Sequence, residues 1–360
     1  MKKIKVIHII HNLEIGGVET AILSSLNDLN IDFDFTLICI GSIKPDILSK
    51  LNSEILKKTF QINSITNLCK CLVMIKKNSK YPIILSSLWK AHLFHGVLNL
   101  LLNPSHSIVI LHSAKFAHLL DRLGILIGLK FASEIWADSQ STLKFISPYI
   151  SSKKTTKKIS FLLQHYTPKI KSQNKKKEFK FIFLGRISQE KRLDLSVKFI
   201  NELKQRGLNI SLDIFGPDNQ TWESLSKYIN ALNLNNLIKY KGICPFEETP
   251  NLLSQYDAFV LMSDYEGMSI STVQAMEIGL LCFLRNVGEI ANYGENMVNS
   301  VILKSEQPDD WQEFIENSVN VLNNQTLQKT ILSNSTAKFA NQLTYTQDII
   351  QNLKRLSTNS

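Results

Sequence analysis

The feature that most constrains this chain is an alternation, repeated along nearly its whole length, between short apolar runs and segments with the apolar spacing of helices. In the first half, the runs typical of strands are Ile4–Ile10, Phe35–Ile40, Ile83–Ser86, Ile108–Leu111 and Ile135–Ala137. In the second half they are Phe179–Leu184, Ile210–Phe215, Ile238–Tyr240, Ala258–Met262 and Leu281–Leu284. Strands that alternate with helices predict βαβ units and parallel sheets. The pattern therefore indicates an α/β protein with a doubly wound sheet in each half.

A lysine-rich polar stretch separates the two halves. Residues 169–178 interrupt the alternation, and polar stretches of this kind commonly link domains. A chain of 360 residues is long enough for two domains of ordinary size. We therefore predict an N-terminal domain over residues 1–168, a linker over 169–178 and a C-terminal domain over 179–340. Residues 341–360 are expected to form a C-terminal helix that packs back on the N-terminal domain.

Cysteine usage and the length of the apolar runs bear on the compartment. The five cysteines are odd in number and none has C-x-x-C spacing, which is typical of a reduced cytoplasmic protein. The basic start of the chain imitates a signal peptide, but its apolar run is short and we interpret it as a strand. No uncharged apolar stretch reaches the roughly 18–20 residues that span a bilayer. We expect a cytoplasmic protein, soluble or peripheral at the inner face of the plasma membrane.

The net charge of +10 is unevenly distributed. Residues 1–178 contain 25 Lys and Arg against 11 Asp and Glu, a net +14, whereas residues 179–360 contain 16 against 20, a net −4. This asymmetry indicates that the first half faces an anionic partner. No RNP, zinc-finger or basic-helix pattern supports nucleic acid. An anionic membrane surface fits better, and plain solubility is the alternative.

Two glycines follow the first predicted strand. Gly16 and Gly17 lie at a strand-to-helix turn, where the helix that follows presents free N–H groups to an anion. A phosphate or a sugar hydroxyl fits such a turn. Two glycines in this position also serve simply as a tight turn.

The second half opens in a similar way, with an apolar strand that ends in Gly185-Arg186. A cation there lies at the carboxyl end of a parallel sheet, where ligands of this fold class bind. Lys191 follows at a helix start and can converge on the same diphosphate. Arg can fork onto two phosphate oxygens, whereas Lys acts as a point charge. The alternative is a solvated basic helix start.

The strongest signal follows the predicted strand Ala258–Met262. Glu266 and Gly267 lie at the strand end, where the carboxylate can accept hydrogen bonds from sugar hydroxyls. A helix begins next, and its first amides, which can meet a phosphate, belong to Met268, Ser269 and Ile270. Gln274, two turns further on, can reach a ribose. The simpler interpretation is a strand-to-helix turn followed by a buried helix.

Taken together, these segments resemble the retaining GT-B glycosyltransferases of family four, the glycosyl transferases of group 1. The residues that carry the resemblance are Gly16-Gly17, Gly185-Arg186, Glu190-Lys191, Phe215-Gly216-Pro217 and Glu266-Gly267 through Ala275-Met276. It covers nearly the whole chain and is most specific between Phe179 and Ile290. The resemblance implies two Rossmann-like domains with parallel sheets facing across a cleft. It also implies nucleotide-sugar binding mainly by the C-terminal domain, and no metal or other cofactor.

The resemblance also implies roles for single residues. Arg186 and Lys191 would hold the donor diphosphate, and Glu266 would contact the donor sugar. His112 follows the predicted strand Ile108–Leu111 and is similar in position to a first-domain histidine of the family, which contacts the sugar near the reacting carbon through its side chain or backbone oxygen. A histidine at a strand end is otherwise more often structural. Glu266 and His112 are thus the candidate catalytic residues.

The chain departs from the family pattern at two places. Gln274 stands where the family's E-x7-E motif has a second glutamate, which usually meets the ribose. An amide can still bond ribose hydroxyls, but without a charge-assisted hydrogen bond. The other departure is at Leu163-Gln164-His165-Tyr166, where the family often has an Asn-Gly turn before the linker. Glu277, a few residues beyond Gln274, is interpreted as a solvated helix residue.

One acidic pattern points elsewhere. Asp32-Phe33-Asp34 matches the metal-binding D-x-D of a different glycosyltransferase fold. Here it precedes the second strand of the first domain, away from the carboxyl end of any sheet. We therefore expect no metal site there.

The expected activity is a metal-independent, retaining, hexosyltransferase-type transfer from a nucleoside-diphosphate sugar to an acceptor hydroxyl. The leaving phosphate would accept the acceptor's proton, and cations and helix N-termini would stabilise the diphosphate. The acceptor, a glycan or lipid-linked glycan of bacterial cell-surface polysaccharide or lipopolysaccharide biosynthesis, is expected on the basic first domain. Two alternatives remain: a non-catalytic subunit that binds nucleotide sugars, and a nucleotide-sugar 2-epimerase.

Overall fold

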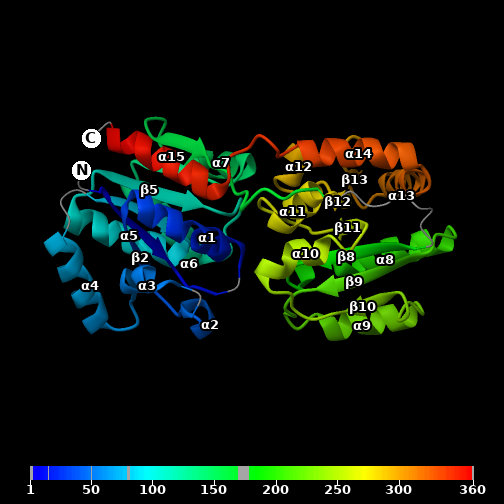
Figure 1. Ribbon diagram of the computed structural model, residues 1–360, viewed down its shortest axis with the longest axis horizontal. Helices are drawn as coiled ribbons and strands as arrows, with labels where there is room; N and C mark the ends of the chain where they lie inside the picture. The colour runs from blue at the N-terminus through cyan, green and yellow to red at the C-terminus, as the bar shows by residue number, and fades with distance from the viewer. Residues whose placement is uncertain (1–2, 15, 50, 79–81, 169–177, 359–360) are drawn as a thin grey trace. The chain divides into compact units, whose positions relative to one another are not determined.

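The computed structural model describes residues 3–14, 16–49, 51–78, 82–168 and 178–358. The chain forms two units: Met1–Gln164 with Leu343–Ser360, and His165–Gln342. Residues 169–177 of the expected linker lie outside the described residues. Each unit is built around its own parallel sheet (Figure 1).

The first unit contains a seven-stranded parallel sheet in the order β3-β2-β1-β4-β5-β6-β7. The strands are β1 (Lys5–Ile10), β2 (Asp34–Cys39), β3 (Thr59–Gln61), β4 (Ile83–Ser87), β5 (His106–Leu111), β6 (Glu134–Ala137) and β7 (Thr155–Lys158). In the central ladder, Val6 of β1 pairs with Phe35 on one side and Ile83 on the other. The chain changes direction across the sheet between β1 and β4, and ligands of open α/β sheets bind at such a switch point.

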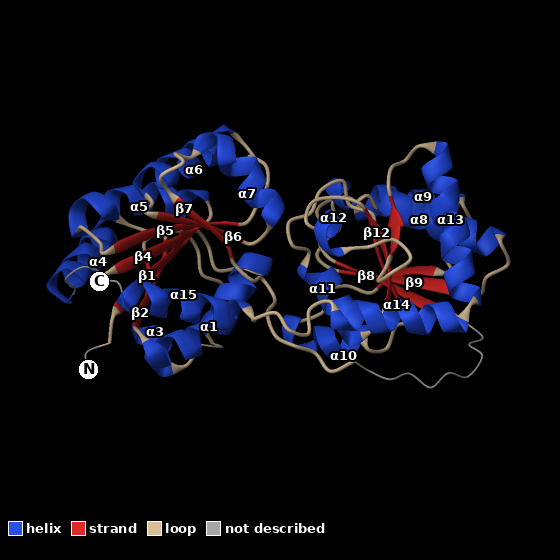
Figure 2. Cartoon of the chain, turned by 90° about the horizontal axis from the view of Figure 1, so that it is seen from above, coloured by secondary structure: helices blue, strands red, loops and turns tan. Residues whose placement is uncertain are grey.

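Helices cover both faces of this sheet (Figure 2). They are α1 (Gly17–Asp32), α2 (Pro45–Leu48), α3 (Ser53–Lys57), α4 (Ile65–Asn78), α5 (Trp89–Leu102), α6 (Leu119–Phe131), α7 (Gln140–Ile146), the 3₁₀ turn Ser147–Tyr149 and α15 (Tyr345–Thr358). Cys71 of α4 and Leu98 of α5 share one core cluster with β1 and β4, and Leu129 of α6 shares another with β5 and β6. On the other face α15 lies beside α1, and its Arg355 donates a 2.7 Å hydrogen bond to Glu134. The end of the chain thus belongs to the first unit.

The second unit contains a six-stranded parallel sheet in the order β10-β9-β8-β11-β12-β13. The strands are β8 (Phe179–Leu184), β9 (Ile210–Phe215), β10 (Ile238–Tyr240), β11 (Ala258–Leu261), β12 (Leu281–Arg285) and β13 (Val301–Leu303). The helices are α8 (Leu193–Gln205), α9 (Trp222–Ala231), α10 (Thr249–Leu253), α11 (Ile270–Ile278), α12 (Ile290–Tyr293), α13 (Pro308–Asn323) and α14 (Gln325–Ala337), with 3₁₀ turns at Gln189–Lys191 and Phe246–Glu248. The switch point lies between β8 and β11, which are adjacent through the pair Ala258 and Phe181.

The predicted α/β class is confirmed, and each strand predicted from the sequence is present with small shifts at its ends. Three strands were not predicted: β3, β7 and β13. β7 has the sequence Thr-Thr-Lys-Lys and is largely exposed at the sheet edge, so it carries no apolar signal. β3 has the sequence Thr-Phe-Gln, with a single apolar residue, and β13 is a run of three buried apolar residues that the sequence pattern did not distinguish.

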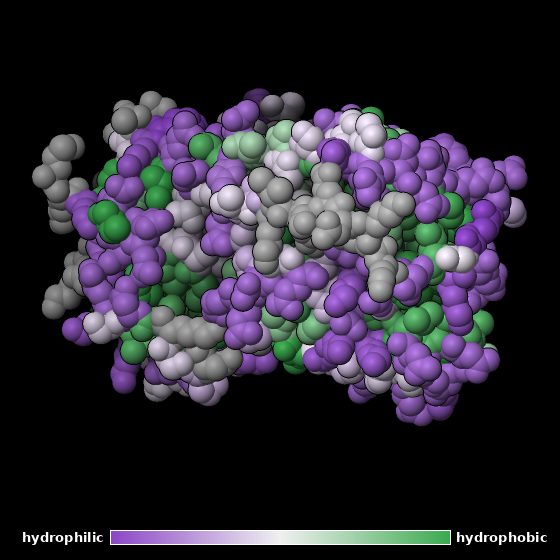
Figure 3. Space-filling view, turned by 45° about the vertical axis from the view of Figure 1, so that its right-hand side comes forward, coloured by the Kyte–Doolittle hydropathy of each residue, from purple (hydrophilic) through white to green (hydrophobic). Residues whose placement is uncertain are grey.

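The face of the molecule that Figure 3 draws is mainly polar. Figure 3 shows one face on which hydrophilic side chains dominate and hydrophobic ones gather in small, separate patches. Within the part of the chain that the structure describes, no helix is both long and apolar enough to cross a bilayer. Among the large apolar side chains that do reach solvent, Leu119 and Leu100 are the most exposed.

Candidate functional site

The turns after β8 and β11 meet at the carboxyl edge of the second sheet. The Asp264 amide donates to the Glu190 carbonyl at 2.9 Å, which joins the two turns directly. Glycines allow the close approach of the neighbouring loops: a Cβ on Gly216, which has φ +140°, would lie 1.8 Å from the Gly185 carbonyl oxygen. The backbone around the predicted site is therefore held tightly, and a side chain at Gly216 would disrupt it.

Lys191 and Glu266, predicted as diphosphate and sugar contacts, form an ion pair with Nζ 2.7 Å from Oε1. The same Oε1 accepts a 2.6 Å hydrogen bond from the Ser263 hydroxyl. The Lys191 and Glu266 side chains are only 19% and 7% exposed. Because both bonds use Oε1, the Oε2 atom of Glu266 remains as an acceptor for a further donor. The Lys191 charge is partly balanced already.

Arg186 follows β8 and is exposed. Among the described residues its guanidinium has no ion-pair partner, whereas Lys191, five positions later, is paired with Glu266. A guanidinium that is free in this way can fork onto two oxygens of an anion. Of the two cations predicted for a diphosphate, Arg186 is the one whose charge is uncompensated.

Helix α11 begins beside this pair. Its N-cap, Ser269, has a left-handed backbone with φ +54°, and the Met268 carbonyl accepts a hydrogen bond from Tyr293 at 3.2 Å. Half-buried Gly267 separates this segment from Glu266. The first amides of a helix have no acceptor within the helix. The structure therefore brings the predicted amides of residues 268–270 to the same edge of the sheet as Lys191 and Glu266.

Two polar side chains of α11 face the start of the second unit. Gln274 is 3% exposed, and its Nε2 donates to the Tyr166 hydroxyl at 2.7 Å. Glu277 is buried as well, with Oε1 3.1 Å from His165 Nδ1. Burial raises the pKa of Glu277 to about 7, and its hydrogen bond with His165 opposes that rise. The interpretation of Glu277 as a solvated residue is wrong, because residues 272–278 of α11 are all buried and only its first turn is half-exposed.

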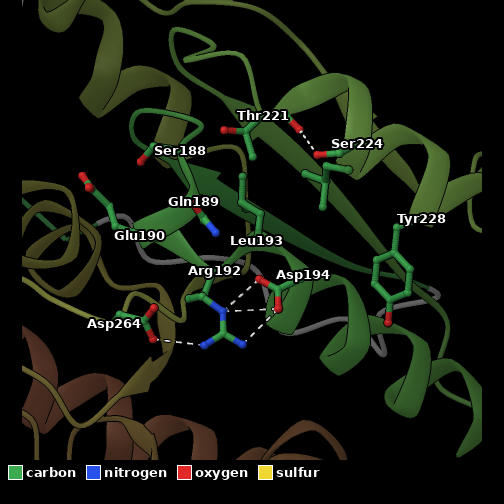
Figure 4. Close-up of a pocket in the computed structure, with 11 residues that line it drawn as sticks. Ser188, Gln189, Glu190, Arg192, Leu193, Asp194, Thr221, Ser224, Tyr228 and Asp264 are labelled. Atoms are coloured by element: carbon green, nitrogen blue, oxygen red, sulfur yellow. Dashed lines mark hydrogen bonds and ion pairs between the residues drawn. The ribbon is translucent and has the colours of Figure 1, made fainter.

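A pocket of about 660 Å³ adjoins the turn that contains Ser188, Gln189, Glu190 and Arg192 (Figure 4). It is lined by Ser188, Gln189, Glu190, Arg192, Leu193, Asp194, Thr221, Ser224, Leu225, Tyr228 and Asp264. Arg192 has a left-handed backbone and binds Asp194, Asp264 and Glu306. Hydrogen bonds, first to Asp194 and then to Glu306, raise the pKa of Arg192. This network, which the sequence did not predict, fixes the backbone next to Lys191.

In the first unit His112 lies at the carboxyl end of β5, as predicted, but its ring faces inward. Nε2 is 3.3 Å from the Ser87 hydroxyl and Nδ1 is 3.5 Å from an Asp138 oxygen. The side chain is only 5% exposed, and the ring packs against Phe161. Both ring nitrogens thus point into the first unit, although Nδ1 makes no hydrogen bond there with any described residue. The backbone carbonyl is the oxygen that His112 can offer to a ligand.

The residues around His112 were missed by the sequence reasoning. Ser87 ends β4 and Asp138 follows β6, so each occupies a carboxyl strand end, and that position could have identified them. His8 Nε2 lies 3.0 Å from the Ser87 hydroxyl. Burial, with a smaller contribution from His112, lowers the pKa of His8 to about 3, so His8 is neutral. The Ser87 hydroxyl, which lies between His8 and His112, thus fixes the side of the His112 ring that carries Nε2.

The glycine turn of the first unit, predicted to meet an anion, lies close to the Glu19 carboxylate of the helix that follows it. Gly17 begins α1 and Gly16 is its N-cap, with a carbonyl that accepts from Thr20 Oγ1 at 2.7 Å. A Cβ on Gly16 would lie 2.3 Å from Glu19 Oε2. A carboxylate in the first turn already interacts favourably with the helix dipole. An external anion would compete with Glu19 there.

The D-x-D pattern lies at the amino end of β2, as expected. Asp34 is 3.6 Å from Lys5 and 3.4 Å from Lys58, and Asp32 is 2.9 Å from Lys354. These carboxylates are therefore neutralised by lysines. In the described residues no group of three His, Cys, Asp or Glu side chains has the arrangement of a metal site.

Comparisons with known proteins give a family match over the second unit and solved structures of similar fold. A family model described as glycosyl transferases group 1 matches residues 167–337. The structure of Anabaena Alr3699/HepE in complex with UDP and glucose has a TM-score of 0.79 at 15% identity, over 99% of this chain and 100% of that one. The lipopolysaccharide outer core galactosyltransferase WaaB has a TM-score of 0.73 at 15% identity, over 98% and 99%. Sucrose-phosphate synthase from Thermosynechococcus elongatus has a TM-score of 0.79 at 13% identity, over 99% and 100%. No curated protein sequence matches the chain.

Proposed function

We propose that this chain, which has the GT-B fold and whose residues 167–337 match the family model of glycosyl transferases group 1, moves a sugar from a nucleoside-diphosphate sugar to an acceptor hydroxyl with retained anomeric configuration. One observation carries this proposal. The turns after β8 and β11 place an uncompensated arginine, the Lys191–Glu266 pair and the start of α11 at one sheet edge. Cations and helix amides suit a diphosphate, and a carboxylate beside them suits the hydroxyls of the attached sugar.

The proposed chemistry needs no protein nucleophile. Arg186 forks onto the diphosphate, and Lys191 shares its charge between the phosphate and Glu266 as the leaving group becomes more negative. Glu266 aligns the sugar because its Oε2 accepts a hydrogen bond from a sugar hydroxyl, whereas its Oε1 already binds Lys191 and Ser263. The leaving phosphate oxygen takes the proton of the acceptor hydroxyl. Because the cations already stabilise the diphosphate, we propose that the reaction is metal-independent.

The role that the family resemblance implies for His112 is assigned to its backbone. Nε2 bonds Ser87, and Nδ1 is buried and faces Asp138 at 3.5 Å, so we assign the contact with a sugar hydroxyl to the carbonyl oxygen. His112→Ala is then expected to retain more activity than Glu266→Ala in a transfer assay. A larger loss for His112→Ala would show that the imidazole itself acts.

Calorimetry with Arg186→Ala tests donor binding. UDP, ADP, GDP and CDP are titrated into the protein, and the tightest is compared with its nucleoside. Arg186→Ala is expected to weaken the diphosphate about tenfold or more and to leave the nucleoside unchanged. Arg206→Ala, at another exposed arginine of the same unit, is the matched control. Equal losses for diphosphate and nucleoside would contradict the proposal.

We also propose that the acceptor is a lipid-linked or cell-surface glycan and that the first unit meets an anionic membrane. Leu119 and Leu120 at the start of α6 are 83% and 58% exposed. Three exposed cations accompany them: Lys115 precedes α6, Arg122 is in its first turn, and Lys144 is on α7. Apolar side chains among cations suit the boundary of an anionic bilayer. The similarity of fold to WaaB supports a cell-surface acceptor.

Vesicle flotation tests the membrane contact. The protein is expected to float with vesicles of phosphatidylglycerol and phosphatidylethanolamine and not with phosphatidylcholine alone. The double variant Leu119→Ser with Leu120→Ser should lose most of this binding, whereas Ile243→Ser, at an exposed apolar side chain of the second unit, should retain it. Unchanged flotation of the double variant would exclude this surface.

A further inference from the structure

The two departures from the family pattern contact each other. Tyr166 accepts a 2.7 Å hydrogen bond from Gln274 Nε2, although the two residues lie 108 positions apart in the sequence. A change from glutamate to glutamine on α11 is thus accompanied by a hydroxyl directed at its nitrogen. This pairing suggests that the two substitutions serve one purpose.

The chemical difference between the two side chains explains what the hydroxyl does. A carboxylate offers acceptors at both oxygens, whereas an amide has an acceptor end and a donor end. In a buried site, an amide nitrogen without a partner is costly, and Gln274 is 3% exposed. Because Tyr166 takes the Nε2 end, the amide cannot rotate without losing that bond. The Oε1 end therefore stays in one direction as an acceptor, as a carboxylate oxygen would.

His165 holds Tyr166 in place for this task. His165 Nδ1 lies 3.1 Å from Glu277 Oε1, and its Nε2 lies 2.9 Å from the Gln342 carbonyl oxygen. Glu277 is three positions after Gln274 and therefore lies on the same side of α11. The segment His165-Tyr166 is thus attached to α11 at two points, one turn apart.

We infer that Tyr166 is a positioning residue, which orients the Gln274 amide so that its oxygen accepts a hydrogen bond from a ribose hydroxyl of the donor nucleotide. The inference rests on the proposed function, since it needs a nucleotide at this site. By holding Nε2, Tyr166 leaves Gln274 Oε1 as an acceptor of fixed direction, as a glutamate oxygen would be. Nucleotide affinity then depends on a tyrosine that need not touch the nucleotide.

The test compares a nucleotide with its analogue that lacks the ribose hydroxyls. Calorimetry measures the tightest of UDP, ADP, GDP and CDP beside its 2′,3′-dideoxy form. Tyr166→Phe is expected to weaken the ribonucleotide about fivefold and to leave the dideoxy form unchanged. In a Gln274→Glu background, where both ends of the side chain are acceptors, the effect of Tyr166→Phe should fall below about twofold. Tyr149→Phe, at an exposed tyrosine of the first unit, should have no effect in either background.

The outcomes separate this inference from the function on which it rests. If the wild-type chain binds none of the four nucleoside diphosphates, the proposed function fails and the inference with it. If it binds one, and Tyr166→Phe weakens the ribonucleotide and the dideoxy form equally, Tyr166 is merely structural and only the inference fails. An unchanged affinity of Tyr166→Phe for the ribonucleotide would overturn it in the same way.

Discussion

Buried histidines should make the first unit sensitive to acid. His8 and His95 are both almost fully buried, and burial lowers the pKa of each to about 3 from the ordinary value of 6.5. Between these two pH values each histidine is protonated in the unfolded chain and neutral in the folded chain. The free energy of unfolding is therefore highest above pH 6.5 and decreases as the pH falls below that value.

The magnitude follows from the two pKa values. Between about pH 7.5 and about pH 5, a histidine with these folded and unfolded values changes the free energy of unfolding by about 2 kcal/mol. The free energy of unfolding of the first unit should therefore decrease by about 4 kcal/mol over that range through His8 and His95 together. Glu277 in the second unit has the opposite sign: its pKa is raised to about 7, so acidification through that value stabilises the folded form.

Urea denaturation at the two pH values, followed by hydrogen exchange of peptides from β4 and α5, measures the effect in the first unit. His8→Gln and His95→Gln should each reduce the loss between the two pH values by about 2 kcal/mol, even if they lower stability at both. His106→Gln, at a half-buried histidine of the same sheet, is the control and should leave the loss unchanged. A loss that is the same in His8→Gln, His95→Gln and wild type would refute the reasoning.

Further predictions concern the site. Gln274→Glu should keep or raise donor affinity by up to about 1–2 kcal/mol with little change in turnover, whereas Glu266→Ala should depress turnover; steady-state kinetics decide both, and the reverse pattern would contradict them. Transfer activity should persist in EDTA, and an activity that is lost in the chelator and restored by manganese or magnesium would contradict metal independence. Gly216→Ala should destabilise the protein by more than about 1 kcal/mol because its Cβ would meet the Gly185 carbonyl, and Gly207→Ala, where φ is +79° but nothing lies within 4 Å, should cost less in thermal denaturation.

The sheets were predictable because buried parallel strands are nearly continuous apolar runs. β8 and β9 were predicted to the residue, since each is bounded by polar or glycine residues. β7 was not, because an edge strand exposed to solvent tolerates Thr155–Lys158, which has no apolar pattern. Local composition therefore identifies strands inside a sheet better than strands at its edge.

The site was predictable only as far as topology places it. Arg186 and Glu266 follow neighbouring strands, and the sequence indicates that. The bond between Lys191 and Glu266 depends on side-chain directions across 75 positions, which no local pattern encodes. Glu277 was misjudged because a helix buried on all sides has no amphipathic stripe, so its one charged residue looked solvated.

Product analysis by NMR tests the central claim most directly. The purified chain is incubated with a panel of nucleoside-diphosphate sugars, with and without glycan acceptors, and the released diphosphate and the anomeric configuration of the product are followed. We predict release that falls strongly in Arg186→Ala and in Glu266→Ala, and a product with the configuration of the donor. An inverted product would contradict retention. A wild-type chain that transfers no sugar from any donor, and gains transfer only through Gln274→Glu, would contradict the account, because the protein would then be a transferase that has lost its activity.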